Sequence, residues 1–333
     1  MKGEIRFGRL EIGFESSSTS YCFDTTVFHG HSLFWFSLMI FRVSEVVPQL
    51  RVLKKDDIPD IIEISKTTWN GHDHLPFIIN DWLENSSCHP FVLDQSNKVI
   101  AVANVRIIDN GRTAWMEGLR VHSEYRLKGL AERLTVHLVE VAKKLNVKRI
   151  RLVTSGDNIA PIKLAAGIGM EPVVEYAVFW KGFRNYPKWS NNRIELEAAN
   201  SESVLFLMKQ HPNLVPLNAI IRHWDIFDAT KKKIRELEKT SCFLVGSNEL
   251  GAVLSLGVHH STSAGSEWCF SLFATNNDSF LSGLSANLQY ADQNGLRNLL
   301  CIHLPEYTSL YSKISWLRRR NHELRLILHE LVL

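Results

Sequence analysis

The chain has 333 residues, of which 45% are hydrophobic, and its formal net charge at pH 7 is +3. This length exceeds that of one typical domain, so we expect two domains with sizeable cores. The small charge gives no reason to expect nucleic acid as a partner, and no apolar run reaches the ~20 residues needed to cross a bilayer. The five cysteines are scattered without a Cys-x-x-Cys pair, which favours a reducing compartment, the cytoplasm, over a disulfide or zinc framework.

Residues 1–47 are predicted to be an N-terminal extension that is partly disordered. They hold a Ser/Thr-rich patch at 16–20 and an apolar run at 33–41. That run is too short for a membrane span and begins too late for a secretory signal. One helix or strand packed on the rest of the chain, or a role at a membrane surface, are the alternatives.

Residues 48–183 show the mixture of strand and helix patterns typical of an α+β domain. Apolar residues alternate where strands are expected and recur every three or four positions where helices are expected. The predicted elements are a strand over 49–54, a capped helix from Asp56, strands over 91–93, 99–108 and 115–121, a helix over 130–145, a strand over 149–154 and a short helix from Asn158.

A basic loop joins the strand that ends at Val121 to the amphipathic helix. It reads Arg126-Leu127-Lys128-Gly129-Leu130-Ala131. The free N–H groups of the first helical turn and the helix dipole both favour an anion at this position. Gly129 lets a ligand approach the backbone, and Arg126 and Lys128 add full charges. The sequence therefore predicts a phosphate-binding loop.

This loop and its surroundings resemble the acetyl-coenzyme A site of the GNAT acetyltransferases. The family pattern Gln/Arg-x-x-Gly-x-Gly/Ala matches 126–131, and the preceding strand ends in the expected Leu119-x-Val121. Asn158 opens a helix that closes eleven residues later in Gly169-Met170, where the family has Gly-Phe. The resemblance covers about residues 48–183. It implies an α/β/α sandwich of the GNAT fold with a mixed central sheet, acetyl-coenzyme A as co-substrate, and no metal.

The resemblance also implies which residues hold the cofactor and how the acetyl group is transferred. A backbone N–H of 119–121 would polarise the thioester oxygen like an oxyanion hole, and the amine would attack directly in a ternary complex. Asn158 would bind the pantetheine arm, cap its helix, or both. The implied cofactor-binding residues are Leu119, Val121, Arg126, Leu127, Lys128, Gly129, Leu130, Ala131 and Asn158.

Glu117 is the candidate general base. Strict alternation along the strand places it on the same face as Leu119 and Val121, where apolar neighbours would raise the pKa of its carboxyl. The alternative is a structural glutamate that is exposed at a strand edge or paired with Arg106 or Arg120.

The general acid of the family is missing from its usual position. The family has a Tyr seven residues after Asn158, where this chain has Ala165. Another group or water would then protonate the thiolate, or turnover is slow; Tyr176 is nearby in sequence but cannot be placed. The missing Tyr favours a pseudoenzyme that binds acyl-coenzyme A without transfer, whereas retention of Gly129 and Glu117 argues against it.

The loop over 68–76 is the candidate acceptor-binding segment. Trp69, His72 and Asp73 are its predicted substrate-binding residues. His72-x-His74 beside Asp73 permits a metal, but no partner motif supports one, and a plain loop packed by Trp69 is the other alternative.

Residues 196–333, after a linker over 184–195, repeat the order of elements of 48–183. The predicted elements are a helix over 201–210, a hairpin over 242–259, a strand over 268–275, a helix over 279–294, a strand over 297–304, a helix over 306–321 and a strand over 324–332. At the place of the phosphate loop the chain reads 280–285, which keeps Gly283 but no basic residue. This predicts a degenerate GNAT-like half, and so one active site per chain; an unrelated α+β domain is the alternative.

The 69–73 segment, the strand over 117–121 and the degenerate second half together resemble one branch of the superfamily, the vertebrate histidine N-acetyltransferases and the N-acetyltransferases related to them. This resemblance implies a small-molecule amine as acceptor, L-histidine, with N-acetyl-L-histidine as product. A different amine, or a protein or peptide acceptor, stays open.

Overall fold

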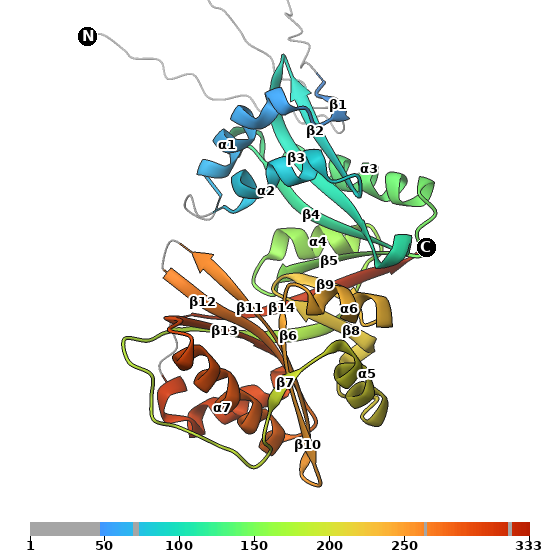
Figure 1. Cartoon of the computed structure of the whole chain (residues 1–333). Coiled ribbons are helices and arrows are strands. Elements are labelled where there is room, and N and C mark those ends of the chain that lie inside the picture. Colours follow the sequence, from blue (N-terminus) through green and yellow to red (C-terminus); the bar gives the residue numbers. More distant parts are fainter. Residues whose placement is uncertain (1–46, 69–72, 263–264, 319–321) are drawn as a thin grey trace, which may run out of the picture.

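The computed structural model describes residues 47–68, 73–262, 265–318 and 322–333. Within these residues one 12-stranded sheet runs through both halves of the chain, in the order β1-β2-β3-β4-β5-β14-β6-β13-β12-β11-β10-β7 (Figure 1). We call residues 48–183 the first half and residues 196–333 the second half. The predicted extension falls outside the described residues, apart from Val47.

The first half contributes six strands to this sheet and four α-helices around it. Its strands are β1 (Gln49–Val52), β2 (Cys88–Gln95), β3 (Lys98–Ile108), β4 (Thr113–Val121), β5 (Arg149–Ser155) and β6 (Glu171–Gly182), and β14 of the second half is inserted among them. Its helices are α1 (Ile58–Lys66), α2 (Leu75–Glu84), α3 (Leu130–Lys144) and α4 (Ile159–Gly167).

Helices cover both faces of this part of the sheet, as the predicted sandwich requires. The α1 and α2 helices bury Ile64 and Ile79 against Val102 of β3, whereas α3 buries Leu134 against the neighbouring Ala103 on the opposite face. Adjacent residues of β3 thus pack into different cores, which is the period-two alternation of a strand buried on both faces.

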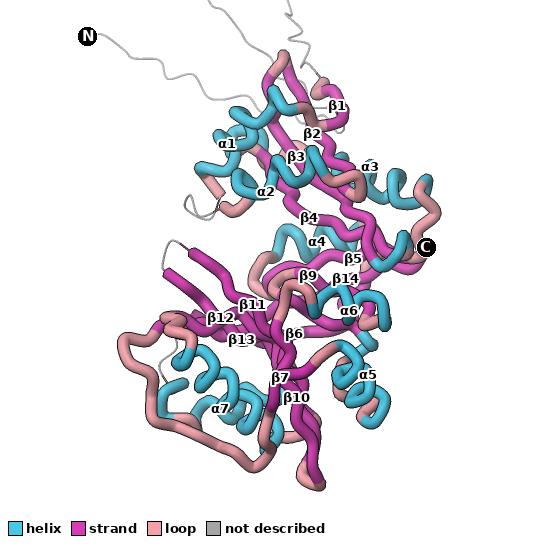
Figure 2. The backbone as a smooth tube through the Cα atoms, in the orientation of Figure 1, coloured by secondary structure: helices cyan, strands magenta, loops and turns pink. Residues whose placement is uncertain are grey.

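The second half repeats this arrangement with different details. Its elements are β7 (Glu197–Ala199), α5 (Ser201–Gln210), β8 (Ala219–Arg222), β9 (Asp225–Asp228), α6 (Lys231–Glu238), β10 (Cys242–Asn248), β11 (Gly251–Thr262), β12 (Gly265–Ala274), α7 (Asn277–Gln293), β13 (Asn298–His303) and β14 (His322–Val332). Figure 2 shows α7 on one side of the strands and α5 and α6 on the other. The hairpin of β8 and β9 was not anticipated from the sequence.

One prediction for the second half is wrong. The segment 306–321 is not one α-helix, since it forms 3-10 turns at Pro305–Lys313 and Ser315–Leu317. The helix predicted over 279–294 is confirmed as α7, so residues 280–285, at the place of the phosphate loop, are helical and pack on the sheet. A Cβ on Gly283 would lie 2.5 Å from Leu272, so this glycine allows close packing of helix on strand rather than ligand approach.

The halves exchange strands. The C-terminal β14 lies antiparallel between β5 and β6 of the first half, and β6 in turn pairs antiparallel with β13 of the second half. Removing either strand would leave backbone N–H and C=O groups of both neighbours without partners, which is costly in a buried sheet. The two halves therefore form one folded body.

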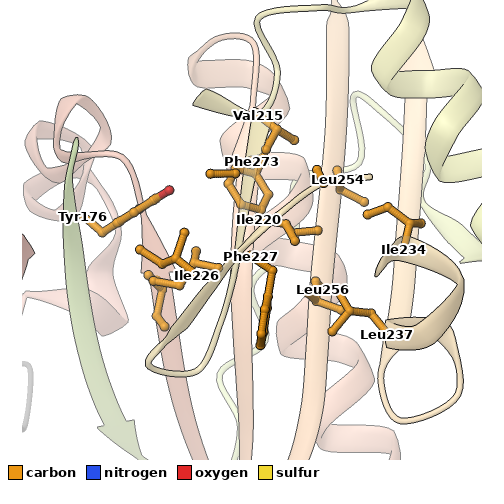
Figure 3. Close-up of a cluster of buried hydrophobic side chains, with 14 of the residues drawn as sticks. Tyr176, Val215, Ile220, Ile226, Phe227, Ile234, Leu237, Leu254, Leu256 and Phe273 are labelled. Carbon is orange, nitrogen blue, oxygen red and sulfur yellow. The ribbon is translucent and has the colours of Figure 1, made fainter. Parts of the chain in front are cut away.

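A shared hydrophobic core lies beneath this exchange. It joins Tyr176 of β6 to the β8–β9 hairpin residues Ile220, Ile226 and Phe227 and to Phe273 of β12 (Figure 3). The Ser271 hydroxyl also donates to the Ile221 carbonyl at 2.6 Å, which ties the hairpin to β12. The hairpin is therefore fixed in the second half while it faces the first.

Asp228 fastens the other side of the hairpin to the first half. Its carboxylate accepts from Arg112 at 2.7 Å, from Arg151 at 3.2 Å and from Arg149, while its backbone N–H donates to Asp109 at 2.9 Å. Burial would raise the pKa of Asp228, but the Arg149 hydrogen bond and three positive charges hold that pKa below its ordinary value of 3.8.

We expect Asp228→Asn to destabilise the chain by about 3 kcal/mol, because it removes the carboxylate that three clustered arginines share: Arg149 and Arg151 keep Glu330, whereas Arg112 is left without a carboxylate among the described residues. Urea unfolding near pH 7 measures this loss. The gap between wild type and variant should close as the pH falls below 3.8, since the stabilisation from a carboxylate with a lowered pKa disappears when it is protonated. Glu202→Gln, which removes an exposed pair with Arg235, is the control and should leave the unfolding midpoint unchanged. Equal midpoints for Asp228→Asn and wild type would contradict the assignment.

Candidate active site

The strands β4 and β5 separate part of the way along their length. They pair in parallel from Thr113 with Arg149 to Trp115 with Arg151, and the pairing stops there although β4 continues to Val121. The backbone of β4 beyond Trp115 therefore has no strand partner on its β5 side, within the described chain. A wedge of this kind leaves those backbone N–H groups of 116–121 that point away from β3 available to a ligand.

A β-bulge at Gly118 changes the facing of the residues after it. Glu117 lies opposite Asn104, and Arg120 lies opposite Val102. Between these two pairs β4 has two residues and β3 has one, which is a β-bulge in β4. Gly118 has φ +67°, and a Cβ there would lie 2.1 Å from the Trp82 ring. Glycine is thus required both by the backbone conformation and by the approach of α2.

The predicted common face of Glu117, Leu119 and Val121 is therefore wrong. Leu119 and Val121 pack with Met116 on the α3 side of the sheet, whereas Glu117 contacts Asn104 and Arg106 on the other. The extra residue of the bulge inverts the alternation that a regular strand would keep.

Glu117 sits in a network of partly buried polar groups. Its Oε1 accepts from the Asn104 amide at 2.8 Å, and its Oε2 accepts from Arg106 Nη2 at 3.0 Å. Burial raises the pKa of Glu117 above 4.5, while the positive charge and hydrogen bonds of Arg106 oppose this rise. The sequence offered pairing with Arg106 as an alternative to a catalytic role for Glu117, and the structure contains this pair. The carboxylate stays ionisable, and its pKa is shifted toward neutrality.

The second half reaches this network through the β8–β9 hairpin. Arg106 Nη2 also donates to Asp225 Oδ1 at 2.7 Å, so one guanidinium is shared between Glu117 and Asp225. The ring centroids of the neighbouring His223 and of His260 lie 5.2 Å apart. Burial, and to a lesser extent the positive charges of His260 and His74, lowers the pKa of His223 to about 4. Sequence reasoning missed these residues; the only signal is the polar and aromatic turn at 222–225 between two pairs of apolar residues.

The predicted phosphate loop has the expected form. Residues 126–129 are exposed, Leu127 and Gly129 have φ of +63° and +73°, and Gly129 is the N-cap of α3. An ideal Cβ on Gly129 would meet nothing within 4 Å, so the space beside this backbone is open. Two residues with positive φ directly before a helix let backbone N–H groups turn toward one point, which suits an anion.

The charged side chains of the loop lie around this helix terminus. Arg126 Nε donates to the Val121 carbonyl at 3.3 Å, and Lys128 Nζ lies 5.2 Å from the centre of the Tyr125 ring. Leu130 is buried under α3 and Ala131 is half-buried, so these two contribute their backbone amides rather than their side chains. The residues present therefore fit a phosphate-bearing group.

The structure shows where Asn158, Ala165 and Tyr176 lie. Asn158 is the half-buried N-cap of α4, but its side chain makes no capping hydrogen bond, which leaves its amide available. Ala165 is buried in the core beneath α4 and offers no proton. Tyr176 lies in β6 with a fully buried hydroxyl that has no hydrogen-bond partner in the described residues, and burial raises its pKa.

The predicted acceptor loop is described only in part. Trp69 and His72 lie outside the described residues. Asp73 is 4% exposed and accepts two hydrogen bonds from Arg120, at 2.8 and 2.9 Å, and one from the Leu75 amide at 3.1 Å. Burial alone would raise the pKa of Asp73, but the hydrogen bonds and positive charge of Arg120 keep that pKa below its ordinary value. This carboxylate thus anchors the loop to β4.

In the described chain, no group of three His, Cys, Asp or Glu residues is arranged to hold a metal ion, and no helix is long and apolar enough to span a membrane.

Known proteins resemble the chain in this region. Residues 58–170 match the model described as the Acetyltransferase (GNAT) family. A histidine N-acetyltransferase from Scomber australasicus is 32% identical over 120 residues, and one from Oreochromis niloticus is 33% identical over 121 residues. Each match covers 36% of this chain and 36% of the relative, so the chain matches about a third of the length of these curated relatives.

The two-part fold also has a counterpart among solved structures. A tandem GNAT protein from the clavulanic acid biosynthesis pathway superposes with a TM-score of 0.55 over 86% of this chain and 98% of that chain, at 11% identity. Identity this low shows the fold alone. These findings confirm the predicted resemblance to the GNAT family, whose model matches residues 58–170, and GNAT proteins use acetyl-coenzyme A.

We expect Gly129→Glu to abolish binding of acetyl-coenzyme A without unfolding the chain, because it places a carboxylate where the phosphate would lie. Calorimetric titration with acetyl-coenzyme A measures this. Gly295→Glu is the matched control, since Gly295 also has a positive φ of +66° and open space around its Cβ but follows α7, far along the chain. It should bear the same backbone strain and keep full affinity. Unchanged affinity in Gly129→Glu would remove the loop from the site.

Proposed function

We propose that this chain is an acetyl-coenzyme A-dependent N-acetyltransferase that acts on a small-molecule amine, with L-histidine as the favoured acceptor. One observation carries the proposal: β4 parts from β5 after Trp115, so that its free backbone, the carboxylate of Glu117 and the anion-binding start of α3 all belong to one strand–loop–helix unit. This combination supplies an oxyanion donor, a base and a cofactor anchor.

Each group of the chain has a defined part in this reaction. When bound, acetyl-coenzyme A supplies the acetyl thioester. The loop over 126–131 holds its phosphates, Asn158 holds the pantetheine arm, and an N–H of Leu119 or Val121 donates to the thioester oxygen. Glu117 takes a proton from the acceptor ammonium, directly or through water, so that the neutral nitrogen attacks. Because Ala165 cannot donate a proton, water is the proposed donor to the leaving thiolate.

Two features support a small amino acid as the acceptor. The curated relatives from fish are histidine N-acetyltransferases, although they match only about a third of their length. The polar network around Glu117 is also closed on one side by the β8–β9 hairpin, through the contact of Asp225 with Arg106. A wall at this position favours a compact acceptor over a protein chain, which needs an open groove.

Release of free coenzyme A thiol from acetyl-coenzyme A, measured across all free amino acids, common polyamines and a mixed peptide pool, tests the proposal. We expect release with L-histidine above every other acceptor. Release with peptides alone would move the function to protein acetylation. Silence across the panel with acetyl-coenzyme A still bound would identify a pseudoenzyme, the reading that Ala165 favours.

We expect Glu117→Gln to reduce kcat by about a hundredfold or more and to remove the acid limb of its pH profile, because an amide cannot accept the proton. In the wild type only the ionised carboxylate is active, so the rate should fall as the pH drops through a pKa that lies above 4.5. Acetyl-coenzyme A affinity should not change. Glu238→Gln, at an exposed position on α6, is the control. An acid limb that persists in Glu117→Gln would exclude Glu117 as the base.

A further inference from the structure

Arg222 is a cation at the junction of the two halves that the fold itself does not use. It ends β8 and pairs across the hairpin with Asp225, the residue that contacts Arg106. Cross-strand partners project from the same face of a hairpin, so the Arg222 side chain leaves the hairpin beside the carboxylate that joins the Glu117 network. His223, the next residue, places its imidazole against that of His260.

The guanidinium of Arg222 has no partner among the described residues. The residue is half-buried, and its Nε is enclosed without a hydrogen bond. The other arginines around the junction differ: Arg106, Arg120 and Arg149 each hold at least one carboxylate within 3.5 Å. A buried donor that stays unpaired destabilises the fold, and a charged one does so more, so an anion that pairs with it is favoured.

Asp225 cannot play that role, although it is the cross-strand neighbour. Its Oδ1 lies 2.7 Å from Arg106, and no contact of 4.0 Å or less joins it to Arg222 among the described residues. Arg106 in turn is neutralised by Glu117 and Asp225 together. The junction therefore presents two carboxylates around one shared cation and, across the hairpin from Asp225, one cation without an anion among the described residues.

We propose that Arg222 binds the α-carboxylate of the acceptor, so that the acceptors of this enzyme are free α-amino acids rather than simple amines. The inference rests on the proposed function and names its substrate class. An α-amino acid carries an ammonium and a carboxylate on neighbouring atoms. Glu117, with Asp225 behind it, suits the ammonium, and the fork of an arginine suits the carboxylate in bidentate geometry. Arg222 is then a specificity residue contributed by the second half to the site of the first.

The test compares acceptors that differ only in the carboxylate. We would measure coenzyme A release with each amino acid and its decarboxylated amine, beginning with L-histidine and histamine, for the wild type, Arg222→Gln and Arg222→Lys. Arg222→Gln should lower kcat/KM for L-histidine about 30- to 100-fold, mainly through KM, and leave histamine unchanged. Arg222→Lys should recover part of the loss, since it restores the charge without the fork.

A second readout does not depend on turnover. Calorimetric titration of L-histidine and of histamine into the chain with coenzyme A bound should show that Arg222→Gln weakens L-histidine alone. The control is Arg235→Gln, whose exposed guanidinium pairs with Glu202 far from the junction and should change neither ligand. Since the Arg222 guanidinium has no partner to lose, the thermal midpoint of Arg222→Gln should not fall below that of the wild type.

The outcomes separate this inference from the proposed function. Equal use of L-histidine and histamine by the wild type, or equal losses for both in Arg222→Gln, would overturn the role of Arg222 while acetylation stands. No coenzyme A release with any amine, together with L-histidine binding that depends on Arg222, would overturn the transferase and support the carboxylate site. L-Histidine binding that is insensitive to Arg222→Gln would reject the site in either case.

Discussion

The exchange of strands between the halves is the constraint on which the rest of the structure depends. Because β14 lies between β5 and β6 and β6 pairs with β13, neither half completes its sheet alone. The exchange places the β8–β9 hairpin against the first half, where Asp228 binds Arg112, Arg149 and Arg151. The same hairpin then carries Asp225 to Arg106 at 2.7 Å. A contact that sets the charge around the proposed base is thus a consequence of sheet topology.

The charges around Glu117 come from residues of both halves. Arg106 serves two carboxylates, one from each half, so the network of Glu117, Arg106 and Asp225 is an anionic environment that suits an ammonium group. Burial and the nearby Asp225 raise the pKa of Glu117, and Arg106 limits the rise. Arg222 then completes a complementary pair of charges for a zwitterion. In this arrangement the second half does not repeat the chemistry of the first but supplies one wall of its acceptor site.

The start of α7 in the second half corresponds to the start of α3, where the first half has its proposed phosphate loop, but at α7 this position is capped. The α7 helix begins two residues after β12, and Asn276 forms a capping box with Ser279, which consumes N–H groups that an anion would need. The Asn276 amide also donates to the Leu250 carbonyl at 2.6 Å. The start of α3 differs, since Gly129 has no side chain with which to cap it. This contrast supports the proposal of one cofactor site per chain.

The sequence by itself determined most elements of the first half and the form of the 126–131 loop, because periodicity, turn residues and the loop pattern act over short stretches of chain. Asn158, Ala165 and the basic loop all lie where local reasoning placed them along their helices. Tertiary structure alone decided the rest. The bulge at Gly118, where a Cβ would collide with the Trp82 ring, reversed the predicted facing of Glu117 relative to Leu119. The contact of Arg106 with Asp225 joins positions 119 residues apart. Pairings of that kind depend on which strand fills which gap in the sheet, and no local pattern carries that information.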